Sequence, residues 1–94
     1  MAVIAGYRRT PFGRLLGGLS SLPATELGAE AVRAALTEAD VSPDEVDVVI
    51  AGHVLQAGAG QNPARQTAVA AGVPLTTPSL TVNSVCLSGT EAIA

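Results

Sequence analysis

Apolar and polar positions separate most regularly along residues 25–39. Apolar side chains recur there at about every fourth position, which places them on one face of a helix, and most charged side chains fall on the other face. Pro23 stands where a first helical turn begins, because proline fits that position without losing a hydrogen bond. The apolar positions of this predicted helix are Leu27, Ala31, Val32, Ala35, Leu36 and Ala39.

Three short apolar runs predict strands instead. Val3–Ala5 is an apolar run followed by a glycine. Val46–Ile50 is rich in β-branched residues, and Leu80–Val82 follows a loop that contains two prolines. Runs of this length and composition are typical of buried strands.

Turn and capping residues separate these segments. Residues 7–22 are rich in glycine and are predicted to form a loop. Ser42-Pro43-Asp44-Glu45 has the pattern of a capping box with proline in the first helical position, and it predicts a single turn. Asn62-Pro63 predicts the start of another helix, which ends at Gly72.

A last helix is predicted after Asn83–Cys86. The predicted order is therefore strand, helix, strand, helix, strand, helix. Helical connections between successive strands favour a largely parallel sheet that is covered by helices. The fold class is thus predicted to be α/β, with three strands alternating with three helices.

Composition adds that the chain is unusually apolar for its size. Hydrophobic residues make up 48% of its 94 positions, and the mean hydropathy is +0.41. A chain this short buries only roughly 60–65% of its unfolded surface, so much of this apolar surface is expected to pack against a partner or within a larger core. Gly89–Ala94 has the pattern of a helix without a stop signal. We therefore expect residues 1–94 to form an incomplete domain.

The charge pattern argues against binding to nucleic acid. The formal net charge is −3, lysine is absent, and the five arginines are scattered along the chain. A nucleic-acid-binding surface requires a basic patch. Arg8, Arg9 and Arg14 lie close together in the sequence, and we interpret them as a solvated face rather than as a phosphate site.

Other features bear on the compartment and on metal binding. No apolar run approaches the ~20 residues of a membrane span, so no membrane association is expected. The N-terminus lacks the basic residues of a signal peptide, and a single cysteine forms no internal disulfide. These features predict a reducing, cytoplasmic location. One histidine and one cysteine without further ligands at metal spacing predict no metal site.

The residue with the clearest chemical potential is Cys86. A lone cysteine is usually a small buried hydrophobe, but this one follows a predicted strand and precedes Ser88-Gly89 at the predicted start of a helix. The free N–H groups and the dipole of a helix N-terminus favour the thiolate form of a cysteine, which is the nucleophile in acyl transfer. The same N–H groups suit the oxyanion that forms when a thioester is attacked.

Three segments resemble the thiolase family. Val82–Gly89 (VNSVCLSG) is similar to the active-site motif of thiolases, in which Asn83 stands three places before the reactive Cys86 and Ser-Gly follows it. Val54–Gln66 is similar to the family's following loop and second helix, and Arg9–Gly13 to a segment near its first strand. The three segments occur in the family's order and span almost the whole chain.

The resemblance implies acyl transfer between acyl-CoA thioesters in fatty acid metabolism, as in an acetyl-CoA acetyltransferase, by condensation or thiolysis. Cys86 corresponds to the family's nucleophile, which takes the acyl group as a thioester, and its backbone N–H would contribute to an oxyanion hole. Coenzyme A thioesters are then substrates, and no bound cofactor is expected. The family's catalytic histidine and second cysteine belong to motifs far downstream, so this chain is expected to be inactive on its own.

The resemblance also implies a partial thiolase-like layered fold. Residues 1–94 correspond to an incomplete thiolase N-terminal domain, ending within the helix that follows Cys86. In the family, the third strand and the helix that carries the cysteine lie at the dimer interface. A homo-oligomer, a dimer or a tetramer, is therefore expected for the full-length protein, and this interface accounts for the apolar excess.

Two other functions fit parts of the pattern. A condensing enzyme of the ketoacyl synthase type also uses a cysteine, but the spacing of Asn83, Cys86 and Ser88-Gly89 favours a thiolase. The remaining alternative is a non-catalytic interaction module that kept the thiolase surface. The chain departs from the family at Arg8-Arg9, which doubles a usually single arginine, and at Thr90-Glu91, where an apolar residue and a polar or basic one are more common.

His53 is a second candidate for chemistry. It follows a predicted strand end, and strand ends in α/β sheets face sites. The family's catalytic histidine lies in a different motif, however. We therefore interpret His53 as a loop residue with a structural hydrogen bond.

Overall fold

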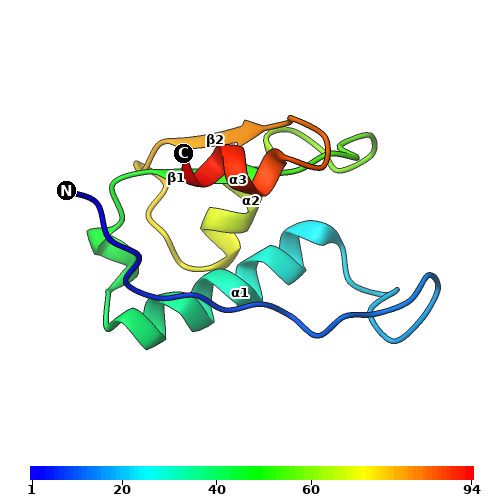
Figure 1. Cartoon of the computed structure of the whole chain (residues 1–94), viewed down its shortest axis with the longest axis horizontal. Coiled ribbons are helices and arrows are strands. Elements are labelled where there is room, and N and C mark those ends of the chain that lie inside the picture. Colours follow the sequence, from blue (N-terminus) through cyan, green and yellow to red (C-terminus); the bar gives the residue numbers. More distant parts are fainter.

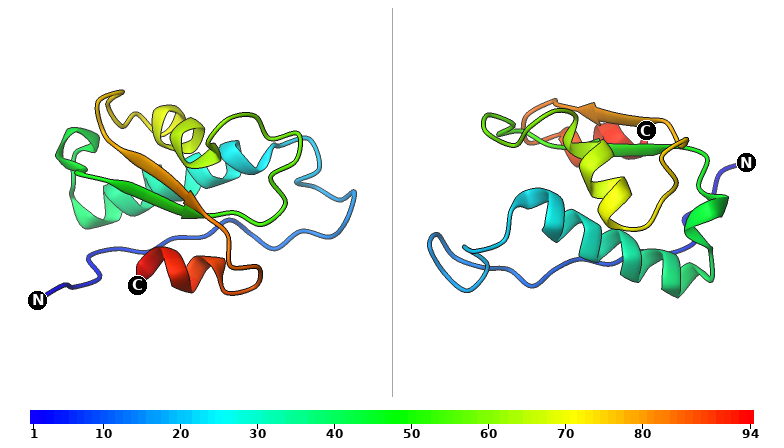
Figure 2. Two further views of the ribbon diagram at one scale, coloured as in Figure 1. Left: turned by 90° about the horizontal axis from the view of Figure 1, so that it is seen from above. Right: turned by 180° about the vertical axis from the view of Figure 1, so that it is seen from behind.

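A computed structural model describes residues 1–94, with helices on both sides of a small sheet (Figure 1). The helices α2 and α3 contact opposite faces of the sheet, and α1 packs on the outer side of α2 (Figures 1 and 2). This arrangement confirms the predicted α/β class. The elements in chain order are α1 (Ala24–Ala39), the 3₁₀ helix η1 (Pro43–Glu45), β1 (Val49–Gly52), α2 (Pro63–Ala70), β2 (Ser79–Val82) and α3 (Ser88–Ile93).

The sheet consists of two parallel strands. Val49 of β1 is paired with Ser79 of β2, and the register continues to Gly52 opposite Val82. The backbone N–H of His53 donates to the Val82 carbonyl at 3.0 Å, which extends the ladder by one residue. Because the strands are parallel and joined through α2, both end at the same edge of the sheet. The prediction of parallel strands is confirmed.

The predicted first strand is absent, and the sheet has two strands rather than three. Residues 1–23 contain no helix or strand, and the side chains of Val3 and Ile4 are each 77% exposed. The segment runs along α1 instead of joining the sheet (Figure 1). Gly6 approaches α1 so closely that a Cβ there would lie 2.9 Å from the Ala35 carbonyl oxygen. The backbone groups of a strand must pair with those of a neighbouring strand. Because residues 1–23 lie along a helix, Val3–Ala5 has no such strand to pair with.

The helix boundaries follow local signals. Asn62 caps α2 by accepting a hydrogen bond from the Arg65 N–H at 3.3 Å, and the predicted capping box forms between Ser42 and Glu45. Pro23 is the N-cap of α1 and not a residue of its first turn. The other end of α1 closes at Asp40, which adopts a left-handed conformation with φ of 56°.

The buried core is small and is made of small side chains. It lies mainly between α1 and α2, where a Cβ on Gly28 would come within 3.0 Å of Thr67. No large side chain is fully buried. The buried hydrophobic residues are Ala29, Ala64, Ala68, Ala71 and Val73.

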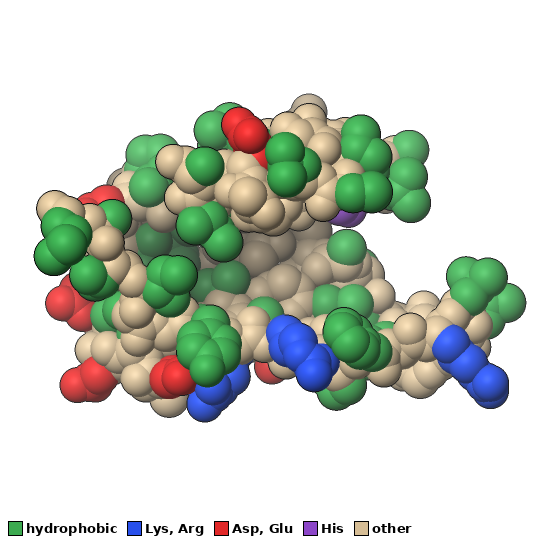
Figure 3. Space-filling model, in the orientation of Figure 1, with side chains coloured by type: hydrophobic (Ala, Val, Ile, Leu, Met, Phe, Trp, Pro, Cys, Tyr) green, Lys and Arg blue, Asp and Glu red, His purple; other side chains and the backbone are tan.

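Much of the apolar content therefore lies on the surface. Hydrophobic side chains gather on both sides of a hollow that separates the sheet from α1 and the N-terminal segment below it (Figure 3). The large apolar residues that are at least three-fifths exposed are Met1, Val3, Ile4, Tyr7, Phe12, Leu15, Leu16, Leu55, Leu75, Val85 and Ile93. None of the helices has the length and the apolar composition needed to cross a membrane.

Candidate functional site

Cys86 lies in a short turn between the end of β2 and the start of α3. Its side chain is exposed and its thiol is free. The first helical residue is Ser88, with Leu87 as the N-cap, so Cys86 stands two residues before the helix and not within its first turn. The backbone N–H groups of Cys86, Gly89 and Thr90 donate to no acceptor within the chain. The predicted strand-to-helix position is thus confirmed, with the helix starting slightly later.

Two side chains hold this turn together. Asn83 accepts a hydrogen bond from the Val85 N–H at 3.0 Å and donates to the Val54 carbonyl at 3.2 Å. The buried hydroxyl of Ser88 donates to the Val85 carbonyl at 2.6 Å and accepts from the Ser84 N–H at 2.9 Å. The turn is therefore tied to itself and to the loop that follows β1.

The backbone of Val85 is unusual. Its φ is 52°, in the left-handed region, which β-branched residues seldom occupy because the side chain crowds the backbone. This residue directly precedes Cys86, so its conformation sets the direction in which the next peptide points. The sequence offers no signal for it, since valine is not a residue that favours such a turn.

Gly52 at the end of β1 allows α3 to begin where it does. A Cβ on Gly52 would lie 2.6 Å from both the carbonyl carbon and the carbonyl oxygen of Ser88, and 2.9 Å from the Gly89 nitrogen. No side chain fits at such distances. Sequence analysis missed this role, although a glycine immediately after a predicted strand is compatible with a close backbone approach.

His53 contributes through its main chain. Its N–H bonds to Val82, as described above, and its carbonyl accepts a hydrogen bond from Gln56 Nε2 at 2.8 Å. Its imidazole makes no hydrogen bond within the chain. His53 lies in the loop after β1, as expected, but its hydrogen bonds are made by its main chain and not by its imidazole. Its side chain is not hydrogen-bonded to Cys86.

The second segment of the thiolase resemblance forms a loop braced by Gln66. Its side-chain amide donates to the Ala59 carbonyl at 2.7 Å and to the Gln61 carbonyl at 2.9 Å. Gly60 adopts a φ of 85° and lies close to the same amide. This loop reaches the cysteine turn through the bond between Asn83 and Val54.

The third segment, Arg9–Gly13, lies along α1 and makes no hydrogen bond or ion pair with the cysteine turn. The Arg9 guanidinium stacks 4.5 Å from the centre of the Phe12 ring, and the exposed Arg8 pairs with Glu38 of α1. The structure thus brings two of the three segments together and leaves this one apart.

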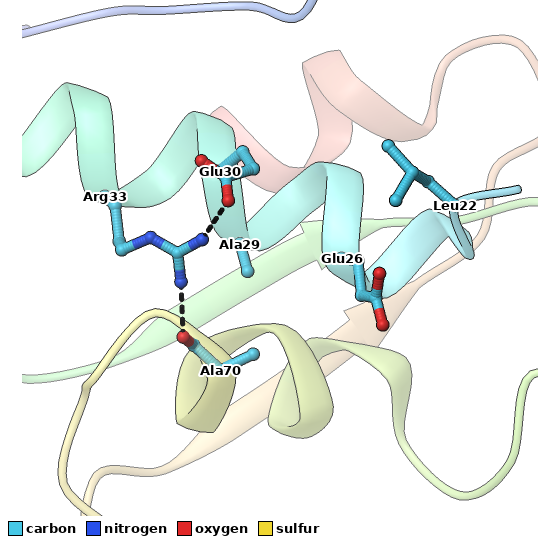
Figure 4. A pocket seen from close by; sticks show the side chains of 6 residues that line it. All are labelled: Leu22, Glu26, Ala29, Glu30, Arg33 and Ala70. Atoms are coloured by element: carbon cyan, nitrogen blue, oxygen red, sulfur yellow. Dashed lines mark hydrogen bonds and ion pairs between the residues drawn. The ribbon is translucent and has the colours of Figure 1, made fainter. Parts of the chain in front are cut away.

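A separate pocket of about 240 Å³ lies between α1 and α2 (Figure 4). Arg33 spans it, donating to the Ala70 carbonyl at 2.6 Å and pairing with Glu30. Neither Cys86 nor any residue of its turn lines this pocket. Its lining residues are Leu22, Glu26, Ala29, Glu30, Arg33 and Ala70.

Comparison with known proteins gives the same family as the sequence motifs. A family profile described as "Thiolase, N-terminal domain" matches residues 2–94. The probable acetyl-CoA acetyltransferase of Mycobacterium leprae is 54% identical over 93 residues, which are 99% of this chain and 24% of that protein. The acetyl-CoA acetyltransferase of Cupriavidus necator is 50% identical over 97% of this chain and 23% of its own length.

A solved structure shows the same fold. The Acat5 thiolase from Ascaris suum, in complex with coenzyme A, superposes with a TM-score of 0.92 at 34% identity. The match covers 96% of this chain and 24% of that one. The chain therefore spans about a quarter of the length of the relatives that it matches.

Proposed function

Because the chain belongs to the thiolase family, we propose that it carries the nucleophile of an acetyl-CoA acetyltransferase, with Cys86 as the residue that accepts the acyl group. The names of the relatives support this substrate class over a ketoacyl synthase or an interaction module. The observation that carries the proposal is the exposed Cys86 thiol on a turn whose neighbouring N–H groups are free.

The proposed step is a thioester exchange. The Cys86 thiolate attacks the carbonyl carbon of an acyl-CoA, a bond forms between that carbon and Sγ, and the bond from that carbon to the coenzyme A sulfur breaks. Coenzyme A leaves as a thiolate and takes up a proton. The tetrahedral intermediate carries a negative oxygen, which backbone N–H groups such as that of Cys86 stabilise by hydrogen bonding.

The complete reaction needs more than this chain contains. Condensation requires a base for the α-carbon of a second acyl-CoA, and Cys86 is the chain's single cysteine. The single histidine of the chain, His53, makes no hydrogen bond to Cys86. We propose that these residues accept an acyl group slowly but do not turn over.

We further propose that the full-length protein is a homo-oligomer that acts in a reducing, cytoplasmic compartment with coenzyme A thioesters as substrates. Each of the two strands has a single neighbour, so β2 has a free edge, and Leu80 on that strand is 54% exposed. A free edge with apolar side chains favours pairing with another chain.

Mass spectrometry of the intact chain tests the proposal. Incubation with acetyl-CoA should add one acetyl group, which peptide mapping places on Cys86. The Cys86→Ala variant should remain unmodified under the same conditions. Acetylation of the variant to the same extent, or an unmodified wild-type chain after prolonged incubation, would remove the basis for the proposed nucleophile.

A further inference from the structure

We infer that Ser88 and Asn83 are positioning residues for the proposed acyl transfer, because together they hold the peptide between Val85 and Cys86 so that the Cys86 N–H faces the oxyanion. The inference rests on the proposed role of Cys86. It goes beyond that role by naming the side chains that set the direction of the oxyanion donor.

The first step of the argument is the geometry of a single peptide. The carbonyl of Val85 and the N–H of Cys86 belong to the same planar unit, and in a trans peptide they point in opposite directions. Ser88 donates to that carbonyl twice, from its hydroxyl at 2.6 Å and from its backbone N–H at 3.1 Å. Fixing the carbonyl toward the helix therefore turns the Cys86 N–H away from it, and this N–H has no acceptor within the chain.

The second step is that this orientation requires a restraint. Val85 has a φ of 52°, and a β-branched residue leaves the left-handed region unless surrounding contacts hold it there. Asn83 Oδ1 holds the Val85 N–H at 3.0 Å, on the other side of the residue from the bond made by Ser88. The Val85 N–H is thus held by a side chain, and its carbonyl is held by both the hydroxyl and the backbone N–H of Ser88. The backbone of Val85 cannot relax without breaking one of these bonds.

The third step concerns how firmly the two side chains are themselves held. Ser88 is buried, with 4% of its surface exposed, and its oxygen also accepts the Ser84 N–H at 2.9 Å. Asn83 is anchored by its second bond, to the Val54 carbonyl. The donor direction is therefore set by groups that are fixed before a substrate arrives, which is the condition for effective oxyanion stabilisation.

Two reactions of the same thiol separate positioning from a merely structural role. Alkylation by iodoacetamide depends on the thiolate and its access, and forms no oxyanion. Acylation by 4-nitrophenyl acetate passes through a tetrahedral oxyanion and releases 4-nitrophenolate, and it needs no coenzyme A pocket. Because the chain has one cysteine, both rates report on Cys86 alone, and their ratio measures the oxyanion contribution.

We expect Ser88→Ala to lower the ratio of acylation to alkylation by about ten-fold, less than the 10²–10³-fold typical when an oxyanion donor is removed outright. Ser88→Thr keeps the hydroxyl and should restore most of the ratio. Thr90→Ala removes a hydroxyl that makes no hydrogen bond in the same helix, and should leave the ratio unchanged. An unchanged ratio in a folded Ser88→Ala variant would overturn the inference.

Asn83→Ala is the second variant, and it decides the matter if Ser88→Ala does not fold, as judged by far-UV circular dichroism. It should lower the ratio in the same direction, and an unchanged ratio would overturn the inference equally. Acylation of wild-type chain by acetyl-CoA is measured in parallel. If the nitrophenyl ester reacts and acetyl-CoA does not, the proposed function fails while the role of Ser88 is still decided by the ratio.

Discussion

Gly52 and Ser88 are in backbone contact across the end of the sheet, at a distance that leaves no space for a side chain on residue 52. A Cβ there would lie 2.6 Å from the Ser88 carbonyl carbon. The contact seats the first turn of α3 against β1, and with it the turn that carries Cys86. The position of the proposed nucleophile thus depends on a residue of the neighbouring strand.

Replacing this glycine should weaken the fold. Gly52→Ala forces the new methyl group against backbone atoms that cannot rotate away, and overpacking of this kind costs about 1–3 kcal/mol. Urea unfolding followed by circular dichroism measures the change. Gly89→Ala is the matched control, because a Cβ there meets nothing within 4 Å, and it should be neutral or slightly stabilising. Equal midpoints for wild type and Gly52→Ala would contradict the close contact.

The capping role of Asn62 predicts a loss of stability on truncation. Its side chain accepts from the Arg65 N–H and from Thr81 Oγ1, and it donates to the Ser79 carbonyl. Asn62→Ala removes these bonds and places alanine at a φ of 43°, so we expect a loss of about 2 kcal/mol, the upper end for an N-cap. Asn62→Gly tolerates the same φ and should lose less. Thermal melts of the three proteins test this order, and a glycine variant less stable than the alanine variant would contradict it.

Cys86 should react quickly with alkylating reagents. The thiol is exposed to the reagent, and the turn that carries it has free N–H groups that can donate to a negatively charged sulfur. Labelling with iodoacetamide near neutral pH, followed by peptide mapping, should show a higher rate for the folded chain than for the same chain in denaturant. In a longer protein with several cysteines, Cys86 should be labelled first. A folded-state rate no higher than the unfolded one would exclude this effect of the turn.

The isolated chain should associate in solution. Large apolar side chains are exposed over much of its surface, and the outer edge of β2 is unpaired. Size-exclusion chromatography with light scattering should give a mass above that of a monomer. If association uses this strand, Leu80→Glu should reduce it more than Leu75→Glu, since Leu75 is also exposed but lies outside the sheet. A well-dispersed wild-type monomer would contradict the expectation.

The 94-residue chain should not form or cleave acetoacetyl-CoA with measurable turnover. Each general acid or base contributes about 10²–10⁴-fold to such reactions, and no second cysteine or hydrogen-bonded histidine accompanies Cys86. A coupled assay with acetoacetyl-CoA and coenzyme A tests this, with Cys86→Ala as the control. Turnover that disappears in the control would show that the active site is complete within these residues.

Much of the local structure followed from the sequence because the interactions that define it are short in range. The capping box of Ser42 and the cap of Asn62 join residues three positions apart, so their residue types suffice to predict the helix starts. The regular spacing of apolar residues along α1 likewise predicted this helix from the sequence alone. The alternation of apolar runs and helices also predicted the parallel pairing of β1 with β2, because a helix between two strands returns the chain in the same direction.

Tertiary structure decided what depends on contacts between distant residues. The run Val3–Ala5 has the composition of a strand, but a strand must pair with the edge of another strand, and this segment lies along α1 instead (Figure 1). The motif predicted that Cys86 lies between a strand and a helix. The direction in which its unpaired backbone N–H points, however, depends on the left-handed backbone of Val85 and on the buried hydroxyl of Ser88. Residue types alone do not predict such a conformation, because valine disfavours it locally and only the surrounding hydrogen bonds make it stable.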